Sequence, residues 1–246
     1  MENPPNEIPR AFSLIPWIVF GIVLISGVAL LLPPLFTSSR VSTEHHSWTA
    51  LKTLSTAEAD FRANDRDWNH VTDFWTGDVK GLYTMTSAAV PGAGNTTVDP
   101  PIKLIHLALA SSDVDPATIE AGGENLPIDK FAVPAAYRGY WHAALISDFS
   151  SPTDTTYKLD TGGKPGMGSC HHPTKFGFLA IPDSTSSGPY AYILNQDGVL
   201  YRGSEIRPSG RARLNRSVPP GLDGISADFT SWPDAQTLKM WWGKLD

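Results

Sequence analysis

Leu14 to Phe36 reads LIPWIVFGIVLISGVALLLPPLF, and this stretch sets the organisation of the whole chain. It lies within a longer segment, bounded by Arg10 and Arg40, that holds no charged residue between its ends. A helix needs about twenty apolar residues to cross the hydrocarbon core of a membrane. The sequence therefore predicts a transmembrane helix over residues 12–36, preceded by a short leader of residues 1–11 and followed by a globular domain of residues 37–246.

A cleaved secretory signal is the competing interpretation of this segment. The apolar region of such a signal is usually shorter and ends in a small-x-small site such as Ala-x-Ala. No such site ends the apolar run here, which favours a retained anchor. Arg10 is the only basic side chain before the span, and Glu2 and Glu7 precede it, so the positive-inside rule does not set the orientation.

Composition limits the class of protein. A chain of 246 residues, of which 41% are hydrophobic and 10% aromatic, can bury one good core and is not composed like a disordered protein. The formal net charge of -6 gives no basic footprint for nucleic acid, so nucleic acid is excluded as an expected partner. With a single cysteine the chain forms no intramolecular disulfide.

The residues around the start of the span carry a family resemblance. Arg10 is followed by Ala11-Phe12-Ser13-Leu14-Ile15, and the apolar run reaches Leu30-Leu31-Leu32-Pro33. This N-terminus resembles that of type IV pilins and secretion-system pseudopilins, in which a basic leader ends at Gly or Ala, a processed Phe follows, and a proline lies further along the helix. The resemblance implies an inner-membrane protein with a cytoplasmic leader and an exported domain. It also implies partners: the lipid bilayer, and other pilin-like subunits or secretion components.

One position departs from that family. Subunits of the filament core usually carry Glu at the fifth mature position, and Pro16 stands there in this chain. Proline suits the first turn of a helix, where its missing N–H has no partner in any case. The departure indicates a retained anchor or a non-core subunit rather than a filament-forming one.

A second helix is expected after the span. Pro33-Pro34 should end or kink the spanning helix, and Ser42 is a plausible cap for the next one. Over Ser42 to Asn64, apolar residues recur three or four apart, as on one face of an amphipathic helix. These residues are Trp48, Leu51, Leu54, Ala57 and Phe61. We expect this face to pack on a sheet.

An acidic loop follows that helix. Asp65, Asp67, Asn69 and Asp73 place side-chain oxygens at positions one, three, five and nine of a calcium loop, and Val71 supplies a carbonyl at seven. The pattern is incomplete, because His70 stands at the sixth place and Thr76 at the twelfth, where such loops carry Gly and Glu. The alternative is an Asp/Asn-rich turn whose side chains bond to their own backbone. Ca²⁺ is therefore the one cofactor that the sequence suggests.

The same region carries a second resemblance, on separated stretches of the chain. They are Thr56 to Asp67, Asp73 to Val79, Gly81 to Tyr83, Lys175 to Phe178 and Ala191 to Leu194. These stretches resemble a group of bacterial proteins that join a pilin-like N-terminus to an exported domain. The resemblance implies location and architecture rather than a chemical activity.

The remainder of the chain reads as strands and loops. Tyr140 to Ile146 and Phe176 to Ile181 are apolar runs of strand length. Tyr190 to Leu194 and Val199 to Arg202 form a predicted hairpin, because Asp197-Gly198 suits the positive backbone angles of a tight turn. Lys103 to Ala110 fits neither helix nor strand periodicity cleanly, and Val90 to Pro101 and Pro208 to Asp223 are expected to be loops. The predicted fold class is α+β, helix first and an antiparallel sheet afterwards, as in a pilin.

Three adjacent residues, Cys170-His171-His172, are the other candidate ligands for a metal, with His45 and His46 elsewhere. Adjacent residues of an extended chain point to opposite faces, so a single ion would rarely bind all three. A surface loop between Ser169 and Pro173 is the favoured interpretation.

No nucleophile or nucleotide-binding motif is present, which makes an enzyme the weaker class. Trp232, Trp241 and Trp242 are expected to pack in the core or at an edge, with an exposed partner surface as the alternative. The sequence thus predicts a membrane-anchored, exported structural or interaction protein. The alternative is an exported domain that binds calcium or another ligand, or that is catalytic.

Overall fold

The computed structural model of the chain describes residues 15–67, 69–84, 102–114, 128–159, 170–184, 186–203 and 231–245. Within its first helix, the side chains of residues 15–18, 21, 25 and 27–40 are not described. The predicted leader with Ala11 and Phe12, and the predicted loops Val90 to Pro101 and Pro208 to Asp223, lie outside the described residues.

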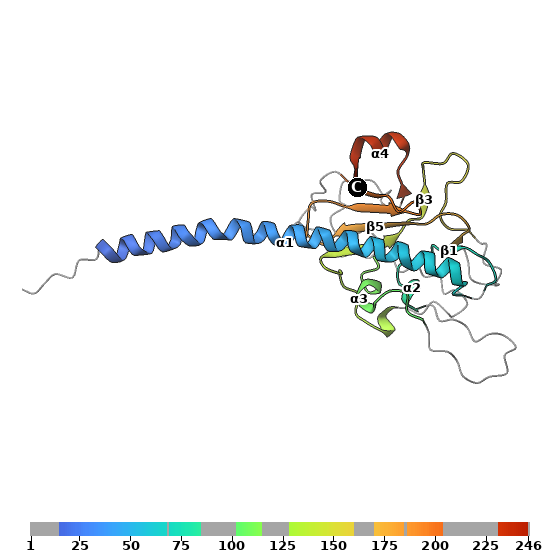
Figure 1. Cartoon of the computed structure of the whole chain (residues 1–246), viewed down its shortest axis with the longest axis horizontal. Helices are drawn as coiled ribbons and strands as arrows, with labels where there is room; N and C mark the ends of the chain where they lie inside the picture. Colours follow the sequence, from blue (N-terminus) through green and yellow to red (C-terminus); the bar gives the residue numbers. More distant parts are fainter. Residues whose placement is uncertain are drawn as a thin grey trace, which may run out of the picture. The chain divides into compact units, whose positions relative to one another are not determined.

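The first helix, α1, runs without interruption over Ile15–Asn64 (Figure 1). Of the two predicted outcomes at Pro33-Pro34, an end or a kink, the end is wrong, because both prolines lie inside α1. The prediction that Ser42 caps a second helix is wrong for the same reason. A proline removes one backbone hydrogen bond, and the strong helix formers Ala29 to Leu32 immediately before the two prolines favour continuation of the helix. Contacts divide the chain into two units, residues 1–40 and residues 41–246. Over the residues that the structure describes, no helix has an apolar stretch long enough to cross a membrane.

The predicted amphipathic face of α1 is confirmed in the second unit. Its buried residues Leu51, Leu54, Ala57 and Phe61 lie three or four positions apart, and these residues and the neighbouring Ala50 are at most 4% exposed. Trp48, on the same face, is partly buried, and its ring centroid lies 5.8 Å from that of Tyr192 in the sheet. Burial of this apolar face against the sheet, rather than helix propensity alone, stabilises this part of α1.

The main sheet has five antiparallel strands in the order β2-β5-β6-β7-β9. Their bounds are β2 Tyr140–Ala144, β5 Gly177–Pro182, β6 Tyr192–Asn195, β7 Leu200–Gly203 and β9 Trp242–Leu245. Two small sheets pair β1 (Phe74–Trp75) with β4 (His171–His172) antiparallel, and β3 (Ser147–Asp148) with β8 (Ser231–Trp232) parallel. Short helices complete the described elements: α2 Gly81–Thr84, α3 Leu107–Ala110, the 3-10 turn η1 Ile128–Lys130, and α4 Ala235–Trp241. The chain is α+β with antiparallel sheets, as predicted.

Several predicted elements are confirmed. β2 lies within the first apolar run, and β5 matches the second with a shift of one residue at each end. β6 and β7 form the expected hairpin, with Leu194 opposite Leu200. Gly198 adopts a φ of 70°, the left-handed conformation that its turn requires. The ambiguous segment Lys103 to Ala110 ends in the short helix α3.

The sheet separates two apolar clusters. Alternate side chains of β5 belong to different clusters. Phe178 and Ala180 pack with the buried face of α1, whereas Leu179 and Ile181 belong to a smaller cluster that includes Tyr157 and Trp232. Side chains of a strand point alternately to its two faces, so β5 contributes to both.

Trp75 is wholly buried at the point where α1, β1 and α2 meet. Its indole Nε1 donates to the backbone carbonyl of Asp78 at 2.9 Å. Gly77 and Gly81 lie directly against the indole ring, and a Cβ at either position would collide with it. The absence of two side chains therefore makes room for the ring.

Candidate functional site

Strand β4 places two adjacent histidines in different surroundings. Its pairing with β1 sets Phe74 opposite His172 and Trp75 opposite His171. His171 contacts Asp67 and Asp73, whereas His172 contacts Asp154. The expectation that their side chains separate is thus confirmed. The expectation of a surface loop is wrong, because pairing with β1 buries both histidines and Cys170 to 2% exposure or less.

On one side of β4 lies the inner cluster, which comprises Glu58, Asp67, Asp73 and His171. His171 Nε2 lies 3.3 Å from Asp67 Oδ2, and Nδ1 lies 4.0 Å from Asp73 Oδ2. Glu58 Oε2 accepts the backbone N–H of Trp75 at 3.0 Å. Burial raises the pKa of Glu58 well above its usual range; the hydrogen bond from Trp75 N–H opposes this rise, and the charge of Asp73 adds to it. These contacts link α1 to β1 and β4. All four side chains are closed to solvent, so none of them is accessible to a substrate.

The residues of the predicted calcium loop make hydrogen bonds within the loop. Asp65 Oδ2 accepts the N–H of His70 at 3.1 Å, and Asn69 Oδ1 accepts that of Val71 at 2.7 Å. The Val71 carbonyl accepts from Asp73 N–H at 3.1 Å, which makes the segment a succession of local turns. Of the predicted ligands, Asp67 and Asp73 approach the ring of His171. Across the described parts of the chain, no group of three His, Cys, Asp or Glu side chains is placed to hold a metal ion.

Another buried carboxyl side chain, that of Asp113, lies outside the inner cluster and was not singled out from the sequence. Its Oδ2 accepts the backbone N–H groups of Val79 and Lys80, both at 2.8 Å, while Lys80 Nζ lies 3.1 Å from Asp78 Oδ2. Burial, with the nearby charge of Asp78, raises the pKa of Asp113 to about 8. Asp113 lies far from Asp78 in sequence, and no local motif signals their contact.

Two other groups of a kind that is often catalytic, the Cys170 thiol and the Ser112–His142 pair, are buried. The pKa of the Cys170 thiol rises to about 12, because it is buried and then because Asp67, Asp78 and Asp73 surround it. The pKa of His142 falls to about 3 through burial and the neighbouring His106, although Ser112 Oγ lies 2.8 Å from its Nδ1. Neither the thiol nor this Ser–His pair, which is closed to solvent, is suited to catalysis.

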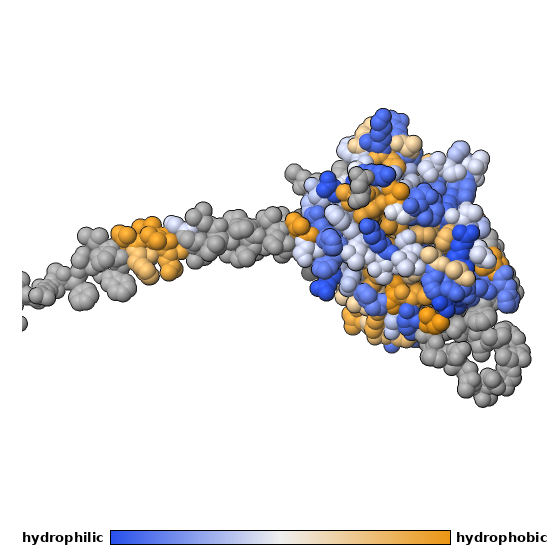
Figure 2. All heavy atoms as spheres, viewed as in Figure 1, coloured by the Kyte–Doolittle hydropathy of each residue, from blue (hydrophilic) through white to orange (hydrophobic). Residues whose placement is uncertain are grey.

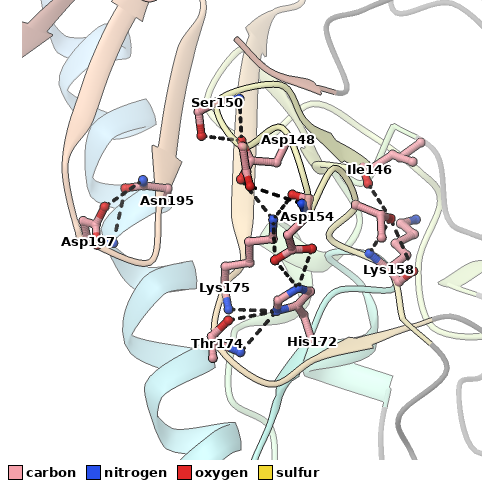
Figure 3. Close-up of polar contacts among 12 residues, drawn as sticks. Ile146, Asp148, Ser150, Asp154, Lys158, His172, Thr174, Lys175, Asn195 and Asp197 are labelled. Carbon is pink, nitrogen blue, oxygen red and sulfur yellow. Dashed lines mark hydrogen bonds and ion pairs between the residues drawn. The ribbon is translucent and has the colours of Figure 1, made fainter. Parts of the chain in front are cut away.

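On the other side of β4 lies the outer cluster, which comprises Asp148, Asp154, His172 and Lys175 (Figure 3). Lys175 Nζ lies 3.1 Å from Asp148 Oδ2 and 2.9 Å from Asp154 Oδ2, and it donates to the Asp154 carbonyl at 2.6 Å. The side chains of Lys175 and Asp148 are less than a tenth exposed, whereas that of Asp154 is 44% exposed. The outer cluster thus holds a nearly buried amine between two carboxylates, one of which reaches solvent.

Hydrogen bonds fix the orientation of the outer cluster. His172 Nδ1 accepts the N–H groups of Thr174 and Lys175, both at 3.1 Å, so its proton is assigned to Nε2, which faces Asp154 Oδ2 at 3.3 Å. Burial lowers the pKa of His172 and keeps the ring neutral. Partial burial acts to raise the pKa of Asp154, but the hydrogen bonds and charges of Lys175 and His172 outweigh it and lower that pKa. Asp154 is therefore a carboxylate at neutral pH.

The tryptophans divide between core and surface. Trp232 is buried, whereas Trp241, on α4, is 56% exposed beside the exposed Met240. Trp242 begins the edge strand β9 and is partly buried. The predicted packing role is thus confirmed for Trp232, whereas Trp241 is exposed.

Comparison with protein-family models, with curated proteins and with solved structures finds no match for this chain.

Proposed function

We propose that the protein is a membrane-anchored structural or interaction protein with an exported domain. In this proposal α1 is the anchor of a pilin- or pseudopilin-like protein, either a non-core subunit or a tethered domain, and the domain recruits its partners by contact rather than by catalysis. Lipid and other pilin-like subunits or secretion components are its partners.

The single observation that carries the proposal is the continuity of α1. One helix of 50 residues begins in the uncharged apolar segment and ends in the core of the globular unit. The described side chains near its start are apolar and more than half exposed (Figure 2): Val19, Phe20, Ile22, Val23 and Leu24. Contiguous exposed apolar side chains mark a surface that binds lipid or another protein.

The second half of the same helix supports the pilin-like architecture. The predicted pilin-like fold has a helix first and an antiparallel sheet afterwards, and α1 packs its apolar face on such a sheet. The buried thiol and the buried Ser112–His142 pair supply no accessible nucleophile, which favours a binding role over catalysis.

The test measures membrane insertion and processing of the full chain in the cell. We expect the protein to sediment with membranes, to lose its C-terminal domain to protease added outside the inner membrane, and to show a mature start at Phe12 by intact mass. A start at Met1 or Glu2 would contradict pilin-type processing and leave a single-span anchor. A domain protected from external protease would contradict export.

A pair of variants separates the apolar segment from the rest of α1. Ile22→Lys with Val23→Lys places two charges in the proposed span, at a cost of about 3 kcal/mol each near the membrane centre, and should release the protein into the soluble fraction. Val41→Lys is the matched control, since Val41 is an exposed valine of the same helix outside the span. Equal membrane association of the two variants would overturn the anchor.

A further inference from the structure

Lys175 and Asp148 form an ion pair that is more deeply buried than an ordinary surface ion pair. The two side chains are each less than a tenth exposed, and the Nζ to Oδ2 distance is 3.1 Å. The Lys175 amine also lies 5.3 Å from the centre of the Tyr157 ring, which closes one side of the pair. Three groups that would assist a reaction between the amine and the carboxyl surround them (Figure 3).

We propose that Lys175 and Asp148 form an intramolecular isopeptide bond, in which Nζ of the lysine becomes an amide nitrogen on Cγ of the aspartate. The outer cluster is then a self-modification site, and its only reactants are two side chains of this chain. The reaction requires neither membrane nor partner, so it stands independently of the proposed function.

Ser150 is placed to stabilise the developing charge. Its backbone N–H and its Oγ–H donate to Asp148 Oδ1 at 2.9 and 2.6 Å. Oδ1 is the oxygen that becomes negative when the amine attacks Cγ, while Oδ2 faces Lys175 and leaves. Two donors fixed on that oxygen before the reaction form the arrangement that stabilises tetrahedral intermediates of acyl transfer.

Asp154 is placed to carry the proton. Its carboxylate Oδ2 lies 2.9 Å from Lys175 Nζ, and its lowered pKa keeps it unprotonated and ready to accept. His172 is a positioning residue here, because its Nε2–H faces Asp154 Oδ2 while its Nδ1 is fixed by two backbone N–H groups.

The reaction is a condensation that balances without an oxidant or a co-reactant. Lys175 first transfers one proton to Asp148 Oδ2, which leaves a neutral amine and a neutral carboxyl. Nζ then attacks Cγ, Asp154 takes a second proton from the nitrogen, and it returns that proton to the departing Oδ2. The Cγ–Oδ2 bond breaks, the Nζ–Cγ bond forms, and one water molecule leaves.

The bond would cross-link two segments that the chain otherwise joins only through a long connection. Asp148 belongs to β3 and Lys175 precedes β5. With one cysteine the chain forms no intramolecular disulfide, so this amide would be its covalent clamp. A cross-link of this kind restricts the unfolded chain.

The test is peptide mass spectrometry of the purified full chain after proteolysis. We expect a branched peptide that joins the segment carrying Lys175 to the segment carrying Asp148, lighter by one water molecule than the two linear peptides together. Fragmentation should place the link on those two residues. Linear peptides alone, with a free Lys175 amine, would overturn the proposal, and so would a link from Lys175 to Asp154.

Three variants test which residues form the isopeptide bond and which assist the reaction. Lys175→Arg keeps the positive charge but removes the nucleophilic amine, and the branched peptide should be lost. Lys158→Arg is the matched control, because Lys158 lies nearby and donates to the Gly77 carbonyl at 2.9 Å, so the branched peptide should remain. Asp154→Asn should reduce the cross-linked fraction at least tenfold, in line with the usual contribution of a positioned proton carrier. Complete cross-linking of Asp154→Asn would overturn the role given to that carboxylate.

Discussion

The inner and outer clusters differ although one two-residue strand serves both. His171 enters a closed layer of carboxylates, whereas His172 faces a lysine and an aspartate that reaches solvent. Both rings are at most 2% exposed, so the difference lies in their partners rather than in their depth. Burial of a titratable side chain therefore does not by itself mark a functional site. The two clusters differ in that one partner in the outer cluster, Asp154, reaches solvent.

The largest expected effect comes from removing the histidine of the inner cluster. His171→Ala leaves Asp67 and Asp73 without the ring between them in a closed core, and loss of one partner of a buried pair costs about 3–5 kcal/mol. His172→Ala removes an acceptor for two backbone N–H groups and should cost only about 1–3 kcal/mol. Urea unfolding of the full chain in detergent measures both, and equal losses would break the distinction between the clusters.

The next effect is on pH dependence and concerns Asp113, a buried carboxyl outside both clusters. Its pKa is raised from 3.8 to about 8 in the folded protein, so its contribution to stability is complete below about pH 4 and is lost as the pH rises toward 8. Asp113→Asn cannot ionise. The free energy of unfolding of the wild type, minus that of the variant, should therefore fall by up to about 1.4 kcal/mol per pH unit across this window.

His142 provides an internal check on that measurement. Its lowered pKa makes stability fall as the pH drops from 6.5 toward about 3, which opposes the slope from Asp113 in the region where the two windows overlap. Because His142 is present in both proteins, its contribution cancels in the difference. Parallel pH profiles for the wild type and Asp113→Asn would show that Asp113 is ionised in the fold.

The smallest expected effect is at an ion pair near the inner cluster but partly open to solvent. Arg66 Nη2 lies 2.6 Å from Asp60 Oδ1, with both side chains roughly a quarter exposed. Arg66→Ala should lower the free energy of unfolding by no more than about 1 kcal/mol, because solvent screens such pairs. Thermal unfolding at low and high salt measures it. A loss of unfolding free energy as large as that of His171→Ala would mean that burial does not determine how much each of these interactions stabilises the fold.

The elements that the sequence predicted share a repeating pattern of side chains. The face of α1 from Ala50 to Phe61, strand β5, and the β6–β7 hairpin with its Asp-Gly turn each carry a periodicity or a turn signal long enough to recognise. The continuity of α1 was missed, because prolines at 33 and 34 were given more weight than the helix-forming residues around them.

The sites were harder to predict than the elements. β1 and β4 are two residues each, too short for any period, and their pairing joins residues distant in the sequence. The acidic loop was noticed for its spacing, yet Asp67 and Asp73 contact a histidine that no local spacing could associate with them. The contact between Lys175 and Asp148 was not predicted, since a single lysine and a single aspartate fit any surface.

Trp75 and its two glycines carry a consequence for how the sequence can diverge. The indole ring occupies the space that side chains at 77 and 81 would need. A homologue should therefore retain all three positions together, or replace the tryptophan with a smaller residue and only then admit alanine at either glycine. Such linked substitution would appear as covariation among residues 75, 77 and 81, a record in related genomes of a packing constraint within a single molecule.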